Sequence, residues 1–201
     1  MVFVEGGGDR NKALATGCRR GFRTFIEKAG FDNRMPTIIA CGGRLGAYKR
    51  FCTAIQSHPS VNAILLVDSE APVTAADRWH HVRDRPGDRW TQPAGSTPEQ
   101  IHLMVQTMEA WFHCDVEALA NYYGSGFQRN SLRSNLNVEQ IAKKDLFDGL
   151  KKATQRTRKG AYSKGLHSFE ILSLIDPRKV HGKSGHAARF LDYLDKVLTS
   201  S

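Results

Sequence analysis

The stretch that decides the fold is AILLVDSE, residues 63–70, in which an apolar run leads directly into acids. The N-terminus has a shorter version, because VFV at residues 2–4 leads into Glu5 and three glycines. Short apolar runs predict buried parallel strands, and ligands of open α/β sheets gather at the carboxyl ends of such strands. Carboxylates that meet there repel one another, so the pattern predicts a divalent cation, Mg²⁺ or Mn²⁺, among Glu5, Asp68 and Glu70.

The spacing of Asp68 and Glu70 supports the metal hypothesis. If the strand continues through both residues, side chains two apart point to the same side and can face one ion. The alternative is that these acids are solvated loop residues. A further acid, Glu109, lies at another predicted strand-to-helix junction. It could be a metal ligand, a residue that orients the ligands, or an acid that the helix dipole favours at a helix N-terminus. Asp115, six residues on, is a weaker candidate of the same kind.

The apolar periodicity predicts an α/β fold with a mainly parallel sheet flanked by helices. Strands are expected over 2–4, 36–41, 61–67 and 101–107, and helices over 11–30, 45–57, 75–82, 108–123, 138–154 and 187–198. Residues 162–174 are ambiguous by this criterion. We expect an α/β core over 1–125 with an irregular insertion at 72–98, and a basic, mostly helical extension over 126–201 that packs on the core as part of one domain.

Length and composition limit the class of protein. The chain has 201 residues, 40% of them hydrophobic, which suffices for one core. No apolar run approaches the roughly 20 residues of a membrane span, and the N-terminus lacks the pattern of a signal peptide. The four cysteines form no Cys-x-x-Cys pair, as is typical of core residues in a reducing compartment. The expectation is a cytoplasmic protein that does not span a membrane.

The positive charge is concentrated in one part of the chain. The formal net charge is +9, and residues 129–189 contain fourteen Lys and Arg against five Asp and Glu. A basic region beside an acidic site is suited to an enzyme that acts on polyanions, since the cations bind phosphates and the acids bind metal. A basic solvated surface without a specific partner is the alternative.

Two segments are candidates for phosphate or nucleic-acid contacts. Gly7 and Gly8, after the first strand, either let the backbone approach a phosphate or only turn the chain toward the helix. The densest basic run includes Arg158, Lys159 and Lys164, which could hold phosphates, with Tyr162 among them to stack on a base. By spacing alone, a solvated basic loop explains this second segment equally well.

Two of these motifs resemble the Toprim fold of topoisomerases, bacterial primases and related nucleases. The segment Val4-Glu5-Gly6 resembles the first Toprim motif, and VDSE at residues 67–70 resembles the second, with Asp-x-Glu in place of Asp-x-Asp. In that fold the glutamate acts as an acid/base or metal-linked residue and the paired acids bind Mg²⁺. The replacement changes the reach of the second carboxylate.

The chain more closely resembles a bacterial Toprim-like family of unknown function, whose members are found beside ATPase genes and are implicated in phage defence. The resemblance is carried by EAWFHCD at 109–115, YSK at 162–164 and IDPRKV at 175–180, in that order. It spans nearly the whole chain, except that residues 72–98 match no motif. It implies nucleic acid as a partner, and an ATPase protein as a second one.

The resemblance implies a Mg²⁺- or Mn²⁺-dependent nuclease acting on DNA or RNA. Asp68 and Glu70 would hold the principal ion, and Glu5 would act as general acid/base or bind a second ion. Glu109 would complete or orient the ligand set, and Lys164 would clamp the scissile phosphate.

The rival hypothesis is a non-catalytic module that uses the same scaffold to bind nucleic acid or the ATPase partner. Convergence of Glu5, Asp68 and Glu70 on one point favours the enzyme, whereas pairing of Glu5 with an arginine favours the module. A primase-like transferase is less favoured, because no zinc or template-binding domain accompanies the motifs. The sequence leaves a homo-oligomer open.

Overall fold

Four short strands form one parallel sheet, as the sequence predicts. The computed structural model describes residues 1–8, 11–58 and 60–199. The strands, in the spatial order β2-β1-β3-β4, are β1 (Val2–Val4), β2 (Ile38–Ala40), β3 (Ile64–Asp68) and β4 (Ile101–Met104). All neighbouring pairs are parallel, and Val4 is in register with both Ala40 and Leu66. The carboxyl ends of the two central strands therefore lie side by side.

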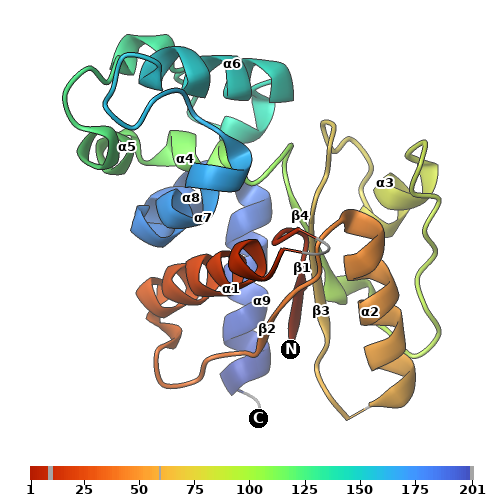
Figure 1. Cartoon of the computed structure of the whole chain (residues 1–201). Coiled ribbons are helices and arrows are strands. Elements are labelled where there is room, and N and C mark those ends of the chain that lie inside the picture. Colours follow the sequence, from red (N-terminus) through yellow and green to blue (C-terminus); the bar gives the residue numbers. More distant parts are fainter. Residues whose placement is uncertain (9–10, 59, 200–201) are drawn as a thin grey trace.

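Helices cover both faces of the sheet (Figure 1). Residues of α1 (Lys12–Ile26) and α9 (Gly185–Thr199) pack on one face, and α7 (Lys164–Leu174) packs on α1. Residues of α2 (Arg44–Ser57) and α3 (Arg78–Asp84) pack on the other face. The first crossover passes over one face and the second over the opposite face. The adjacent ends of β1 and β3 are thus a topological switch point, where α/β folds bind ligands.

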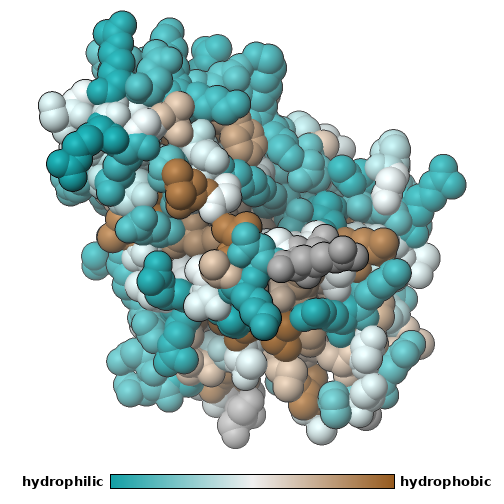
Figure 2. Space-filling view, viewed as in Figure 1, coloured by the Kyte–Doolittle hydropathy of each residue, from teal (hydrophilic) through white to brown (hydrophobic). Residues whose placement is uncertain are grey.

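The strands are buried on both sides because their side chains alternate between two cores. Val4 and Leu66 contribute to the core beneath α1, whereas Phe3 and Leu65 contribute to the core beneath α2. This explains why the strands read as unbroken apolar runs rather than as an alternation. Figure 2 shows that hydrophilic residues cover most of the face on which α1 lies.

The rest of the chain adds helices beyond the carboxyl edge of the sheet. They are α4 (Glu109–Cys114), α5 (Val116–Tyr123), α6 (Lys143–Thr154) and α8 (Pro177–Lys183), with 3₁₀ turns at Pro98–Gln100, Arg129–Ser131 and Val138–Gln140 and a π turn at Glu27–Phe31. Trp111 of α4 is fully buried and stacks on Phe25 of α1 at 5.1 Å between ring centroids. This contact joins the later helices to the first part of the chain.

Two predicted helices differ in the structure. The helix expected over 108–123 is broken at Asp115, whose side chain caps α5 at Ala118 and also accepts hydrogen bonds from Asp176 and Lys179. The helix expected over 138–154 begins only at Lys143. Residues 164–174 are helical, and α8 was not predicted, because its seven residues are too few to show periodicity.

The insertion at 72–98 packs against the α2 face. Its short helix α3 buries Trp79, and Trp90 stacks on Tyr48 of α2 with ring centroids 4.6 Å apart. The guanidinium of Arg44, at the start of α2, lies over the Trp90 ring at 4.9 Å. The insertion therefore helps to position Arg44. Among the helices described, none is long and apolar enough to cross a membrane.

Candidate metal centre

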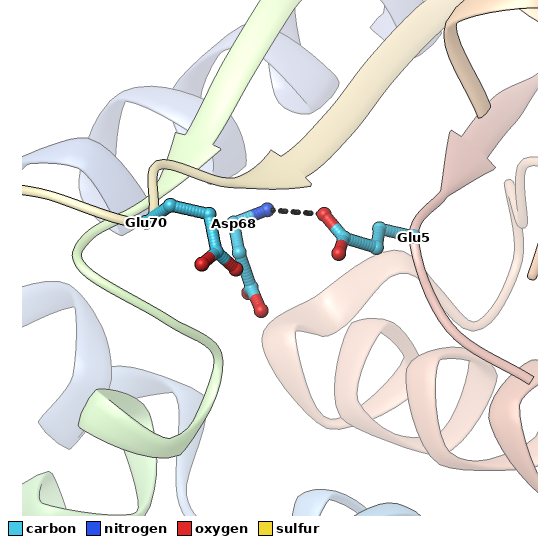
Figure 3. A group of neighbouring side chains, drawn as sticks. All are labelled: Glu5, Asp68 and Glu70. Atoms are coloured by element: carbon cyan, nitrogen blue, oxygen red, sulfur yellow. Dashed lines mark hydrogen bonds between the residues drawn. The ribbon is translucent and has the colours of Figure 1, made fainter. Parts of the chain in front are cut away.

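Three carboxylates meet at the switch point. Glu5 directly follows β1, Asp68 ends β3, and Glu70 comes two residues later (Figure 3). One carboxylate oxygen of each lies within 4.8 Å of the others. The structure thus brings together the three residues that the sequence predicted as ligands.

The route by which Glu70 reaches this point differs from the prediction. The strand does not continue through Glu70; the chain turns after Asp68, where Ser69 N donates to Met104 O at 2.9 Å and Glu70 N to Gln106 O at 2.8 Å. Glu70 has a φ of 65°, a left-handed conformation that costs a non-glycine residue about 1–2 kcal/mol. The turn, not strand alternation, aims the carboxylate of Glu70 at the other two.

Glu5 is held by contacts to one of its two oxygens. Its Oε2 accepts a hydrogen bond from Asp68 N at 3.0 Å and forms an ion pair with Arg44 at 3.4 Å. Burial, followed by the charge of Asp68, raises the pKa of Glu5 to about 7, although Arg44 opposes the shift. Among the contacts that the described residues make, none engages Oε1, which leaves that atom for a ligand.

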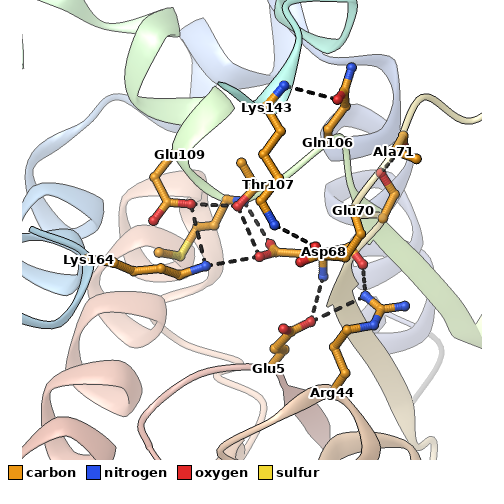
Figure 4. Close-up of polar contacts among 12 residues, drawn as sticks. Glu5, Arg44, Asp68, Glu70, Ala71, Gln106, Thr107, Glu109, Lys143 and Lys164 are labelled. Carbon is orange, nitrogen blue, oxygen red and sulfur yellow. Dashed lines mark hydrogen bonds and ion pairs between the residues drawn. The ribbon is translucent and has the colours of Figure 1, made fainter. Parts of the chain in front are cut away.

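Asp68 is almost fully buried and is fixed by three donors (Figure 4). Met108 N donates to Oδ1 at 2.8 Å, while Thr107 Oγ1 at 3.0 Å and Lys164 Nζ at 3.2 Å donate to Oδ2. The Met108 amide comes from the loop that leads into α4. The carboxylate consequently has a defined orientation at the floor of the site.

Glu109 lies behind Asp68 and is not part of the group of three. It is completely buried, and Tyr162 OH donates to its Oε1 at 2.7 Å. Thr107 Oγ1 lies 2.6 Å from its Oε2 and shares its single proton between this oxygen and Asp68 Oδ2. Thr107 therefore bridges Glu109 and Asp68. Of the three roles that the sequence left open for Glu109, this geometry corresponds to the orienting residue.

Tyr162 differs from the prediction that it stacks on a base. Its side chain is buried among Phe112, Phe147 and His167, so no nucleobase can reach the ring. Burial and the neighbouring Glu109 carboxylate raise the pKa of Tyr162 above its usual value. The hydroxyl keeps its proton and serves as a donor to Glu109.

Two lysines from the basic part of the chain reach the acids. Lys164, the first residue of α7, is half exposed and lies 3.7 Å from Glu109 as well as beside Asp68. Burial opposes its charge, but Asp68 and Glu109 outweigh that effect and raise the pKa of Lys164 above its usual value. Lys143, the first residue of α6, contacts Glu70 at 2.5 Å. Both ammonium groups thus offset the carboxylate charge.

Arg44 and Lys143 were not predicted from the sequence. Arg44 donates to Asp68 O and pairs with Asp88 of the insertion, which also pairs with Arg85 at 3.0 Å. The only sequence signal for Arg44 was its place directly after Gly42-Gly43, at the carboxyl end of a third strand. Lys143 approaches Glu70 through tertiary packing and has no local signal.

A cavity of about 220 Å³ opens onto Glu5, Asp68 and Lys164 and is walled by Gly6, Gly7, Gly8 and Gly42 together with Leu14, Met108, Gly165 and Phe169. Gly7 has a φ of 94°, and a Cβ atom there would lie 2.9 Å from Ala15 Cα of α1. The glycines are therefore needed both to turn the chain and to pack it against α1. Their backbone lines the space in which a ligand of the acids would sit.

Two predicted residues lie away from this cavity. Arg158 and Lys159 are exposed in the loop before α7, and neither lines the cavity. The ammonium group of Lys159 lies over the Tyr122 ring at 4.4 Å. The structure therefore does not join them to the acids, in contrast to Lys164.

The donor set fits a hard divalent cation. Mg²⁺ binds oxygens at about 2.1 Å, so the ligand oxygens of one ion lie roughly 3–4.2 Å apart. The three carboxylates need only a small contraction from their present spacing to reach that range. Neutralisation by such an ion would also offset the repulsion that raises the pKa of Glu5.

Comparison with known proteins identifies a family but no activity. The model of a family described as a domain of unknown function (DUF4276) matches residues 4–195, which include all of the acids above. No curated protein and no solved structure matches the chain. The predicted resemblance to a family of unknown function is thus confirmed at that level, while its Toprim character stays a prediction.

Proposed function

We propose that this chain, which belongs to the DUF4276 family, is a divalent-metal-dependent nuclease that hydrolyses phosphodiester bonds of DNA or RNA. The observation that carries the proposal is the convergence of Glu5, Asp68 and Glu70 beside Lys164 at the switch point of the sheet. Carboxylates with an adjacent cation are the groups that metal-assisted phosphoryl chemistry uses. The fold proposed for this site is Toprim-like, on the motifs quoted above.

The residues have separate roles in the proposed reaction. Oxygens of Asp68 and Glu70, with Glu5 beside them, would hold Mg²⁺ or Mn²⁺, which would supply Lewis-acid charge and a more acidic water molecule. Where Glu5 is not bound to an ion, its carboxylate is placed to accept or return a proton, since burial and the charge of Asp68 raise its pKa to about 7 in the metal-free site. Lys164 Nζ, charged and half exposed, stabilises negative charge that develops on the phosphate.

The supporting residues keep these groups in place. Glu109 and Tyr162 act through Thr107, which fixes Asp68, and are positioning residues rather than catalytic ones. Lys143 forms an ion pair with the carboxylate of Glu70 and so helps to fix its position. Such a shell reduces the reorganisation that would otherwise accompany metal and substrate binding.

A second candidate function is supported by one contact. The ion pair between Arg44 and Glu5 satisfies part of the charge of Glu5 without a metal, as expected of a non-catalytic module that binds nucleic acid or an ATPase protein. The nuclease is favoured because Arg44 engages only Oε2 of Glu5, so the three acids still converge. A role in phage defence belongs to the same proposal and rests on the resemblance alone. A cytoplasmic location is also proposed, on the composition and the dispersed cysteines.

A cleavage assay separates the two functions. Plasmid DNA, single-stranded DNA and RNA are incubated with the protein in Mg²⁺, Mn²⁺ or EDTA, beside the variants Asp68→Asn and Asp148→Asn. Asp148 is an exposed acid on α6 that pairs only with Lys144 among the described residues, so its variant is the matched control. The nuclease predicts metal-dependent cleavage that Asp68→Asn reduces by about a hundredfold or more and that Asp148→Asn leaves unchanged.

The contrary results are equally specific. Binding of nucleic acid without cleavage, together with no heat of Mn²⁺ binding in calorimetry, would establish the module and refute the nuclease. Equal cleavage by wild type and Asp68→Asn would place the activity outside this site.

A further inference from the structure

A basic cavity adjoins the acidic one. It measures about 500 Å³ and shares Gly8 and Gly42 with the acidic cavity, so the two lie on either side of the glycine turn. Lys12 and Arg19 of α1 and Arg50 of α2 line it. None of the lining residues that the structure describes is an acid. A ligand anchored at the acids can therefore pass directly into a space surrounded by cations.

The basic surface continues beyond this cavity along α1. A second groove of about 430 Å³ is lined by Arg19, Arg20 and Arg23, together with residues 35–38, which lead into the edge strand β2. Arg19 belongs to both grooves and joins them. We call the five cations Lys12, Arg19, Arg20, Arg23 and Arg50 the α1 track; α1 itself crosses the front of the molecule in Figure 1.

The track is available to bind an external anion. Within residues 1–8, 11–58 and 60–199, Lys12, Arg19, Arg20 and Arg50 form no ion pair, and only Arg23 does, with Glu27 at 2.8 Å on the exposed helix surface. The Arg19 guanidinium donates to Thr16 Oγ1 at 3.1 Å, a neutral partner. The cations near the acids differ, since Arg44, Lys143 and Lys164 are all paired with carboxylates.

The length of the track suits a polyanion rather than a single phosphate. From Lys12 to Arg23 the helix rises about 16 Å, at 1.5 Å per residue. One strand of a duplex presents a phosphate every 3.4 Å of axis, so this distance corresponds to roughly five phosphates of a duplex strand and to fewer, more widely spaced phosphates of an extended single strand. Surface cations spaced along a groove bind such a backbone without reading its sequence.

We propose that the α1 track binds the sugar-phosphate backbone of the nucleic acid and leads it to the three acids. This rests on the proposed function and deepens it, because it assigns the substrate path to α1 and the start of α2. It also places the backbone-binding surface outside the basic segment 129–189, to which the sequence pattern points; from that segment only Lys164 is assigned a contact with the scissile phosphate. Within that segment, Lys143 and Lys164 serve the acids instead.

The test compares two variants that lose equal charge. The track variant is Lys12→Gln/Arg19→Gln/Arg50→Gln, and the control is Lys49→Gln/Lys151→Gln/Lys152→Gln, three exposed cations off the track of which one neighbours Arg50. Fluorescence anisotropy measures binding of labelled oligo-dT and oligo-rU of about 20 nucleotides in EDTA, so that binding is read without cleavage. Salt is varied between about 50 and 200 mM.

The affinity of the track variant for the oligonucleotides should be lower by about tenfold or more. The slope of its log affinity against log salt concentration should shrink by about 2, since each single-strand phosphate contact contributes about 0.7. The control should resemble wild type. Equal losses in both variants, a loss in the control alone, or no binding by wild type would overturn the proposal. The comparison of DNA with RNA shows which backbone is preferred.

Cleavage in Mg²⁺ by the same proteins separates this proposal from the proposed function. Selective loss of binding in the track variant with no cleavage by wild type would refute the nuclease and leave the track standing. Cleavage by wild type together with unchanged binding by the track variant would refute the track and leave the nuclease standing.

Discussion

In the proposed metal centre, Glu5 would couple the protonation state of the site to its affinity for metal. Burial and the charge of Asp68 raise its pKa to about 7, so near neutral pH a large share of the metal-free protein carries a proton on Glu5. A cation binds only the ionised form and must displace that proton. The folded pKa lies above the ordinary value, so ionisation of Glu5 costs stability unless a cation is bound.

Metal affinity should therefore depend on pH. Below about pH 7 the apparent affinity for Mn²⁺ should rise by up to tenfold per pH unit, because the ion must displace the proton of Glu5. Above that pH the affinity should level off, because Glu5 is already ionised. Calorimetry between pH 5.5 and 8.5 measures this. The variant Glu5→Gln should bind more weakly and with a flatter profile; an unchanged slope in the variant would assign the proton to another group.

Tyr162 and Glu109 are coupled through a buried hydrogen bond. The variant Tyr162→Phe leaves a completely buried carboxylate without one of its donors, which should lower the free energy of unfolding by about 1–3 kcal/mol. Tyr122→Phe is the matched control, because its hydroxyl donates to Glu170 at the exposed surface. Urea unfolding of the two variants checks this, and an equal effect of both would contradict the assigned role of Tyr162.

At the residue scale, the acids were predictable and their partners were not. Glu5, Asp68 and Glu70 follow strands that the apolar pattern reveals, and the ends of parallel strands meet at one edge. Arg44 and Lys143 come from other elements and reach the acids only through packing. The burial of Tyr162 likewise depends on three rings from other segments.

At the scale of elements, the contact between α1 and α7 positions Lys164. Gly21 of α1 lies against the backbone of Phe169 on α7, and a Cβ atom at Gly21 would come within 2.6 Å of Phe169 O. The close approach lets α7 place its first residue over the acids. The glycine is therefore required by packing and not by a turn.

The variant Gly21→Ala should force α1 and α7 apart. The expected loss of stability is about 1–3 kcal/mol, even though alanine favours a helix by about 1 kcal/mol over glycine. Gly182→Ala in α8 is the control, because a Cβ atom there meets no atom within 4 Å, and it should be neutral or stabilising. Thermal unfolding of both variants measures the difference, and a neutral Gly21→Ala would refute the close contact.

The strands and the first two helices could be predicted because their apolar periodicity is strong. The later helices were harder, since Asp115 breaks one helix by capping the next, and α8 is short and starts with Asp176 and Pro177. Both caps are local, since Asp115 accepts from Ala118 N and Asp176 from Arg178 N. Asp115 is also held by Asp176 N and Lys179 from a distant segment, and those contacts leave no local pattern in the sequence. Periodicity therefore describes the sheet layer better than the helices beyond its edge.

At the scale of the whole molecule, the site is assembled from both parts of the chain. The segment 1–125 supplies the acids at the switch point, and the segment 126–201 supplies Lys143 and Lys164. Lys143 and Lys164 of the basic extension thus complete the acidic centre. The proposal above assigns to a substrate the cations Lys12, Arg19, Arg20 and Arg50, which form no ion pair among the described residues. This division explains why the chain carries a high positive charge around an acidic site.

The most direct test of the account is the anomalous diffraction of a crystal that contains Mn²⁺. The account predicts a strong anomalous peak within about 2.4 Å of carboxylate oxygens of Glu5, Asp68 and Glu70, with Lys164 beside Asp68 and not bound to the ion. No peak among these three residues at saturating Mn²⁺, or a peak bound only elsewhere, would contradict the metal centre and the nuclease mechanism built on it.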